Sequence, residues 1–167
     1  MRCRGIERSF EAAYPLFSYE GPMRVLVSAY KKGGRRSLSR LFAGFFAEAI
    51  EERWPDRTIV PVPPRPGKLR ARGWDQVEAI AGLLESRGLP VKRPLERMAS
   101  DEQKSLGRGD RGANARKAYT LRAGERSPEL PLLLDDVVTT CATLDACARA
   151  LKEGGARSVE AIALVAD

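Results

Sequence analysis

The chain contains no histidine and only three cysteines among its 167 residues. Histidine is the commonest general base in enzymes, so any catalysis here must rest on carboxylates, on positioning or on a metal ion. The three cysteines (Cys3, Cys141 and Cys147) form no C-x-x-C pair, and their odd number argues against a disulfide framework. A structural zinc site within this chain is therefore not expected.

Long hydrophobic runs are also missing. No apolar stretch approaches the roughly 20 residues that cross a bilayer. The opening residues, MRCRGIERSFEAAY, lack the apolar run of a secretory signal. We therefore expect a cytoplasmic protein with no membrane partner. With 43% hydrophobic residues, the chain has enough apolar material for one domain that spans residues 1–167.

Acidic residues are scarce relative to basic ones, which gives a formal net charge of +7. The segment 21–47 contains no acidic residue, and a second basic cluster, RPGKLRAR, covers 65–72. Such clusters favour polyanionic partners, either phosphorylated small molecules or nucleic acid, although a merely solvated face is the alternative. The residues expected to contact nucleic acid are Lys31, Lys32, Arg35, Arg36, Lys68, Arg70 and Arg72.

Apolar periodicity predicts strands that alternate with helices. Within residues 1–20 we expect a strand at the edge of the sheet, because Pro15 has no N–H to donate to a second neighbouring strand. Further strands are expected at RTIVPVPP, at 130–134 and at SVEAIALVA, with amphipathic helices between them. This order predicts the α/β class, with a mostly parallel central sheet flanked by helices. Residues 99–118 are polar and glycine-rich, which is typical of a flexible loop with a function.

The stretch LLLDDVVTTCAT, from Leu132 to Thr143, carries the strongest functional signal. A buried strand followed by a short loop and a helix start is where open α/β sheets bind ligands. The amides at the helix start suit a phosphate, and the threonine hydroxyls can add donors. Asp135 and Asp136 would repel an anion unless they face sugar hydroxyls or Mg²⁺. The pattern therefore predicts a sugar-phosphate site, and the alternative is a turn in which these residues serve only as caps.

This stretch resembles the phosphoribosyl-pyrophosphate motif of type I phosphoribosyltransferases. Together with YKKGGRR, VPVPPRPGKLRARGWDQ and QKSLGRGDRGANARKAY, it makes residues 19–167 similar to the ComF family of competence-associated, phosphoribosyltransferase-like proteins. The resemblance implies a type I phosphoribosyltransferase-like fold with a flexible loop over the site. The ligand would be phosphoribosyl pyrophosphate or a nucleotide, with Mg²⁺ as cofactor. The resemblance implies that Asp135 and Asp136 are catalytic and also hold Mg²⁺, directly or indirectly. It implies a phosphate loop of Thr139, Thr140, Cys141, Ala142 and Thr143, and a pyrophosphate loop of Val62, Pro63, Pro64 and Arg65. From the flexible loop it implies Arg108, Arg111 and Arg116.

Three departures from the family pattern bear on function. Cys141 stands where the family normally has glycine, so a positive φ there would cost roughly 1–2 kcal/mol and its Cβ could crowd the phosphate. Trp74 and Asp75 stand where the family more often has phenylalanine and asparagine, and Trp74 is either a stacking platform beside the basic loop or a core anchor at the helix start. The cysteine-rich zinc module that family members carry at the N-terminus is reduced to Cys3, so residues 1–20 would hold at most a remnant of it.

Three functions remain open from the sequence. The first is phosphoribosyl transfer, the second is single-stranded DNA binding during DNA uptake, and the third is ligand sensing without turnover. Competence proteins are the partners that the resemblance implies, and a homodimer stays open. The acceptor of any transfer is not readable from these residues.

Overall fold

The computed structural model describes residues 8–64, 67, 73–98 and 118–166. Several predicted site residues lie outside this part of the chain. They are Arg65, Lys68, Arg70, Arg72, Arg108, Arg111 and Arg116.

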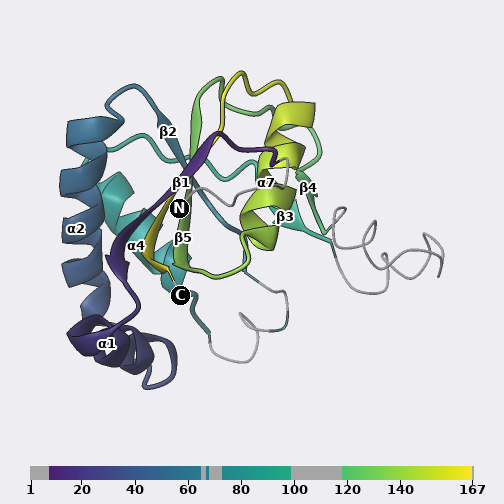
Figure 1. Ribbon diagram of the computed structural model, residues 1–167. Helices are drawn as coiled ribbons and strands as arrows, with labels where there is room; N and C mark the ends of the chain where they lie inside the picture. The colour runs from purple at the N-terminus through teal and green to yellow at the C-terminus, as the bar shows by residue number, and fades with distance from the viewer. Residues whose placement is uncertain (1–7, 65–66, 68–72, 99–117, 167) are drawn as a thin grey trace.

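A four-stranded parallel sheet forms the centre of the described structure (Figure 1). Its strands are β1 (Ala12–Ser18), β6 (Glu160–Ala166), β5 (Pro131–Val138) and β2 (Thr58–Pro61), in that spatial order. The two inner strands, β5 and β6, carry near-continuous apolar runs, as strands covered on both faces should. β1 lies at the edge and contains the proline that predicted this position. The predicted α/β class with a parallel central sheet is confirmed.

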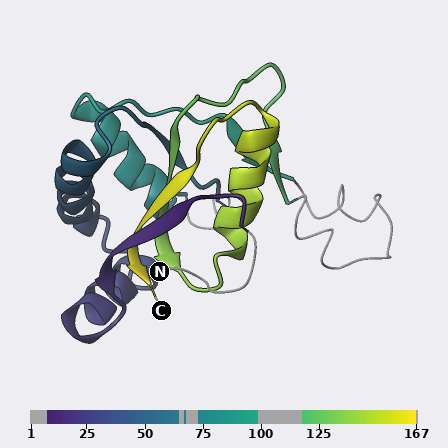
Figure 2. The same ribbon diagram turned by 45° about the horizontal axis from the view of Figure 1, so that its top comes forward.

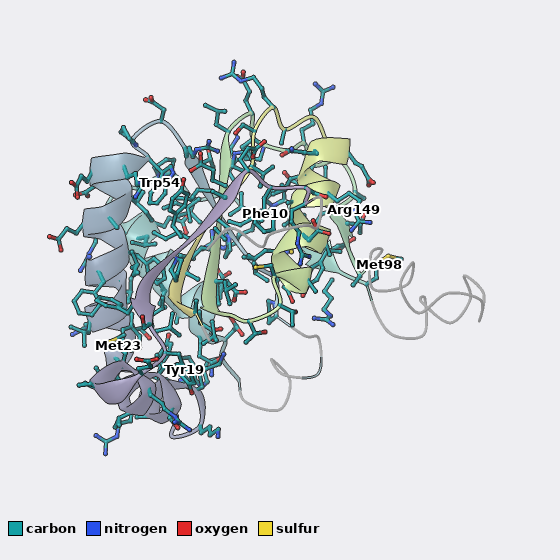
Figure 3. All side chains as sticks on the ribbon, in the orientation of Figure 1. Phe10, Tyr19, Met23, Trp54, Met98 and Arg149 are labelled. Atoms are coloured by element: carbon teal, nitrogen blue, oxygen red, sulfur yellow. The ribbon has the colours of Figure 1, made fainter. Side chains whose placement is uncertain are left out.

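Helices cover both faces of the sheet, as Figures 1 and 2 show. One face packs against α1 (Gly21–Lys31), α2 (Leu38–Arg53) and α4 (Gln76–Ser86). The other packs against α7 (Ala142–Glu153) and a small antiparallel pair, β3 (Leu95–Arg97) with β4 (Tyr119–Leu121). Strand alternation sends neighbouring leucines of β5 into different cores, with Leu132 and Leu134 on the α2 side and Leu133 on the α7 side. Trp54 and Phe10, labelled in Figure 3, belong to these two cores.

The β3–β4 pair was not predicted from the sequence. Arg97 of β3 lies opposite Tyr119 of β4. In the sequence, these two strands stand on either side of the segment that was predicted as a flexible loop. Ala118, the last residue of that predicted segment, is described and buried. The rest of the segment lies outside the described residues.

None of the helices within the described ranges is long and apolar enough to span a membrane.

Candidate functional site

The acidic pair lies inside β5 and not beyond its end, which corrects the predicted strand of 130–134. β5 continues to Val138 because Val137 and Val138 still pair with Val165 and Ala166 of β6. β-Branched residues suit such a pleated, covered position. Because successive strand side chains point to opposite faces, Asp135 and Asp136 diverge.

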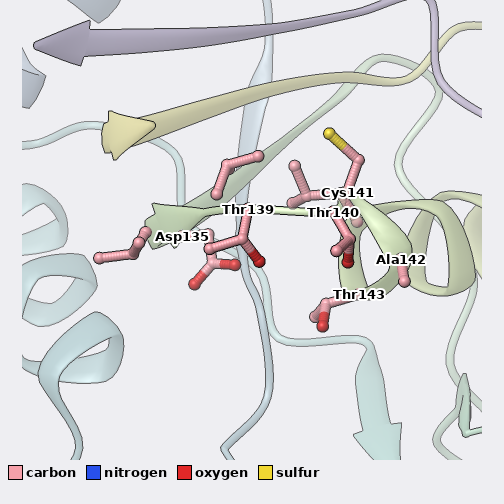
Figure 4. A pocket seen from close by; sticks show the side chains of 9 residues that line it. Asp135, Thr139, Thr140, Cys141, Ala142 and Thr143 are labelled. Carbon is pink, nitrogen blue, oxygen red and sulfur yellow. The ribbon is translucent and has the colours of Figure 1, made fainter. Parts of the chain in front are cut away.

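Asp135 faces the hollow between the end of β5 and the start of α7 (Figure 4). The hollow has a volume of about 40 Å³ and is lined by Asp135 and by residues 137–144. In Figure 4 the oxygen atoms of Asp135, Thr139, Thr140 and Thr143 point to the same side of the chain. The first amides of a helix have no intrahelical partner and carry the positive end of the helix dipole. The arrangement therefore offers amide and hydroxyl donors to an anion, with a carboxyl group beside them.

The backbone of Cys141 adopts the left-handed conformation that the sequence analysis described as costly for a residue other than glycine. Its φ is 60° and its ψ is 2°, and it is the one non-glycine residue with positive φ in the described chain. This conformation costs a residue with a Cβ about 1–2 kcal/mol. The side chain is buried at 4% exposure, and in Figure 4 its sulfur points away from the side that the hydroxyls share. The thiol thus packs into the core under the loop.

The carboxyl group of Asp135 is held in an environment that favours its neutral form. Burial raises its pKa to about 7, and the charge of Asp136 adds to this effect. The backbone N–H of Asp136 donates to Asp135 Oδ1 over 2.8 Å, and together with the charge of Lys31 it opposes the shift. Asp135 can therefore exchange a proton near neutral pH, in contrast to an exposed aspartate.

Asp136 lies on the other face of the sheet and pairs with Lys31 at the end of α1. The distance from Lys31 Nζ to Asp136 Oδ1 is 2.8 Å, and the Asp136 side chain is only 9% exposed. Lys31, predicted to contact nucleic acid, is thus engaged with the acidic pair. The structure brings Asp135 to the threonine loop but holds Asp136 away from it.

The predicted pyrophosphate loop is described for Val62, Pro63 and Pro64. These residues follow β2, and the N–H of Val62 donates to the carbonyl oxygen of Leu134 over 3.0 Å. Parallel strands end at a common edge, so this turn lies next to Asp135. The structure therefore brings two of the predicted loops to one edge of the sheet.

Two residues near these loops were not identified from the sequence. Arg8 Nη2 donates to the carbonyl oxygen of Thr140 over 3.2 Å, which adds a cation beside the threonine loop. Asp75 caps α4, because its Oδ1 accepts from the N–H groups of Val77 and Glu78 over 2.9 and 3.1 Å. A capping position could have been read from the order Trp-Asp-Gln before an apolar helix. Arg8 has no such signal, since 132 residues separate it from Thr140.

The first basic cluster remains largely exposed. Lys32, Arg35 and Arg36 are all exposed, and the Arg36 guanidinium carbon lies 5.2 Å from the ring centroid of Trp74. Trp74 also contacts the core, because its ring centroid lies 5.3 Å from that of the buried Tyr30. Trp74 is therefore both anchored in the core and partly open beside a cation.

Metal ligands are sparse in the described chain, where no group of three or more histidine, cysteine, aspartate or glutamate side chains converges. Asp135 is the carboxylate that faces the hollow. A Mg²⁺ ion commonly takes one or two protein carboxylates and receives its other ligands from phosphates and water. Asp135 fits this role as a single ligand, whereas Asp136 is occupied by Lys31.

No family model matches the chain. It is 31% identical over 150 residues to competence protein ComFC of Streptococcus pneumoniae (strain ATCC BAA-255 / R6), and 27% identical over 153 residues to ComFC of Bacillus subtilis (strain 168). Each alignment covers 90% of this chain. The chain spans 66% and 62% of these relatives, slightly less than two thirds of their length.

Solved structures of hypoxanthine phosphoribosyltransferases are similar at low sequence identity. The enzyme of Trypanosoma cruzi aligns with 79% of this chain and 64% of its own, at 12% identity and a TM-score of 0.47. That of Staphylococcus aureus aligns with 79% and 65%, at 9% identity and a TM-score of 0.45. The two competence proteins align with nearly the whole of this chain. The chain belongs to the ComF family of competence-associated proteins.

Proposed function

We propose that this chain is a phosphoribosyltransferase-like protein that binds phosphoribosyl pyrophosphate, in DNA uptake or in nucleotide salvage. The observation that carries the proposal is the hollow in which the Asp135 carboxyl, three threonine hydroxyls and the start of α7 meet. Family membership supports it, because the curated relatives are named as competence proteins. Other competence proteins are the partners that this role implies.

The groups that line the hollow suit the 5-phosphate and the ribose of this ligand. Amides at the start of α7 and the hydroxyls of Thr139, Thr140 and Thr143 would hold the 5-phosphate. Asp135, once ionised, would accept hydrogen bonds from the ribose hydroxyls. Mg²⁺, when bound, would offset the charge of the pyrophosphate, with Asp135 as its protein ligand. Asp136 would act through Lys31 and the local field, since its carboxylate lies on the other face.

Turnover would join the anomeric carbon to an acceptor with inversion and release pyrophosphate. Positioning and charge stabilisation would supply most of the rate, because the chain has no histidine to serve as a base. Binding without turnover, as in a sensor, needs the same hollow. Ligand binding is therefore the first property to measure.

Calorimetric titration with phosphoribosyl pyrophosphate and Mg²⁺ tests the proposal. We expect binding to the unaltered protein and none to the double variant Asp135→Ala, Asp136→Ala, because the acceptor for the sugar hydroxyls is gone. Asp56→Ala is a matched control, since Asp56 is exposed between α2 and β2. Unchanged affinity in a double variant that keeps its circular dichroism spectrum would refute the sugar-phosphate site.

Single-stranded DNA binding is a second candidate, favoured by the exposed cluster around Trp74. Arg36 lies over the indole ring, and Lys32 and Arg35 are exposed on the same connection between α1 and α2. Bases stack on such aromatic platforms while neighbouring cations neutralise the backbone.

We expect a fluorescent oligothymidylate to bind with an affinity that falls steeply with salt. For each tenfold rise in salt concentration, the logarithm of the binding constant should fall by about 0.7 per phosphate contact. Lys32→Glu with Arg35→Glu should weaken binding. Lys92→Glu should have little effect, because Lys92 is an exposed lysine between α4 and β3. Fluorescence anisotropy at several salt concentrations measures both. A flat salt response, or equal effects of the two substitutions, would remove this candidate.

A further inference from the structure

Arg8 connects the segment before β1 to the threonine loop. Its Nη2 donates to the carbonyl oxygen of Thr140 over 3.2 Å. The segment is fixed at this place, because the N–H of Ser9 donates to Asp145 Oδ1 in the first turn of α7 over 2.7 Å. Phe10, the next residue, is buried in the core on the α7 side of the sheet. Arg8 is therefore held beside the turn that leads into α7.

The contact with Thr140 leaves the Arg8 guanidinium incompletely paired. Its Nε is buried and has no hydrogen-bond partner among the described residues. No described carboxylate forms an ion pair with Arg8. Burying a donor without an acceptor is unfavourable, so such a group in a folded protein calls for an explanation. Within the described chain, the acceptor that Arg8 reaches is a carbonyl oxygen of the candidate phosphate loop.

That carbonyl belongs to the peptide unit between Thr140 and Cys141, which is trans. In a trans peptide unit the C=O and the N–H point in opposite directions. A left-handed residue next to a helical one makes successive N–H groups converge on a concavity that binds anions. Cys141 is such a residue, because its φ is 60° and the helical Ala142 follows it. The orientation of this peptide unit therefore decides whether the loop presents converging N–H groups to an anion.

The competing orientation is a half-turn of the same peptide unit. It would reverse the sign of φ at Cys141 and so remove the cost that the left-handed region imposes on a residue with a Cβ. It would also replace the N–H of Cys141 by the carbonyl oxygen of Thr140, which repels an anion. The hydrogen bond from Arg8 opposes this change. A hydrogen bond from a charged donor contributes free energy of the same order as the left-handed φ costs.

We propose that Arg8 is a positioning residue of the phosphate loop, whose hydrogen bond to Thr140 holds the 140–141 peptide unit in the orientation that binds the 5-phosphate. The inference rests on the proposed function for the identity of the ligand. Glycine adopts positive φ at little cost, so a loop with glycine at 141 would not need this hydrogen bond. Arg8 therefore compensates for the presence of Cys141.

Titration of ribose 5-phosphate into four proteins tests this role. They are the unaltered chain, Arg8→Met, Cys141→Gly and the double variant. Arg8→Met should weaken binding by about 5- to 30-fold in the cysteine background, because the peptide unit then occupies mainly the competing orientation. In the glycine background the same substitution should weaken binding by about twofold or less. Arg8→Lys should recover part of the loss, because its ammonium group keeps a donor.

Arg87→Met is the matched control. Arg87 Nη1 also donates to a backbone carbonyl oxygen, that of Ala43 over 3.1 Å, but on the α2 side of the sheet. This substitution should change the affinity for ribose 5-phosphate in neither background. Melting curves of all variants, followed by circular dichroism, set a temperature at which each of them is folded.

Equal weakening by Arg8→Met in both backgrounds would show that Arg8 acts through its charge alone, which would overturn the positioning role. No weakening in the cysteine background would overturn it too. NMR couplings of Cys141 report its φ without any ligand, and Arg8→Met should shift φ towards negative values. A φ that stays positive would contradict the inference. If the unaltered protein binds neither ribose 5-phosphate nor phosphoribosyl pyrophosphate, the proposed function fails, and the φ of Cys141 in Arg8→Met still decides the role of Arg8.

Discussion

Asp135→Asn is expected to make the folded protein more stable at pH 8 by roughly 2–4 kcal/mol. In the folded state burial raises the pKa of Asp135 from 3.8 to about 7. Because this pKa lies above the unfolded value, the folded chain binds the proton more tightly. The Asp135 contribution is therefore favourable at low pH and is lost as the pH rises through about 7. Asparagine removes the ionisation and with it this loss.

Urea unfolding of the two proteins at pH 4 and at pH 8 measures the effect. The difference in free energy of unfolding should be small at pH 4 and large at pH 8. Asp56→Asn, at an exposed position, should show no such dependence. A difference that is equal at both pH values would contradict the raised pKa.

The same substitution should abolish binding of the sugar phosphate. The loss of stability that ionised Asp135 causes is then explained by its role in ligand binding. Cys141 carries a second cost only a few residues away, because its backbone occupies the left-handed region. Two unfavourable local features at one turn are typical of sites where the surrounding fold holds a strained arrangement for binding. Here the supporting fold is the paired end of β5 and the first turn of α7.

The inner strands and α7 could be predicted because their sequences are locally unambiguous. The leucines before Asp135 form a continuous apolar run, and the residues that α7 buries, among them Leu144, Cys147, Ala148 and Leu151, recur at helical spacing. The end of β5 could not be predicted in the same way. Two aspartates suggest exposure, but pairing with β6 on one side keeps the chain extended through them.

The divergence of the acidic pair follows from that longer strand. Outside a strand, neighbouring carboxylates can converge on one ribose, as the sequence reading assumed. Inside a strand they must point to opposite faces, so Asp136 meets α1 and Asp135 meets α7. A correct strand boundary would have sufficed to predict this split.

Other features depend on tertiary contacts that no local pattern carries. β3 and β4 have three residues each, too few for a period, and the residues that pair across them are 22 to 26 positions apart. In α2 the apolar Leu41 is 43% exposed, whereas Phe46 is fully buried, although both are large apolar residues of the same helix. The position of the sheet relative to the helix decided between these two faces.

Lys31→Met is expected to lower the free energy of unfolding by roughly 2 kcal/mol, because it leaves the carboxylate of Asp136 without its cation. The Asp136 side chain is 9% exposed, so water replaces little of the lost interaction there. Lys31 is 35% exposed, which keeps the effect below that of a fully buried pair. Lys32→Met, one residue later and exposed, should change stability by less than about 0.5 kcal/mol.

A double-mutant cycle identifies the pair as the cause. Lys31→Met combined with Asp136→Asn should recover most of the stability lost by the lysine substitution alone, since no unpaired charge remains. Urea unfolding of the four proteins at pH 8 gives the coupling energy. If the two substitutions simply add, the ion pair is not what holds α1 to β5. Lys31 also lowers the pKa of Asp135, so its loss should shift the ionisation of that carboxyl to higher pH. One lysine on α1 would then set both the stability of the strand end and the pH at which Asp135 can accept a ligand.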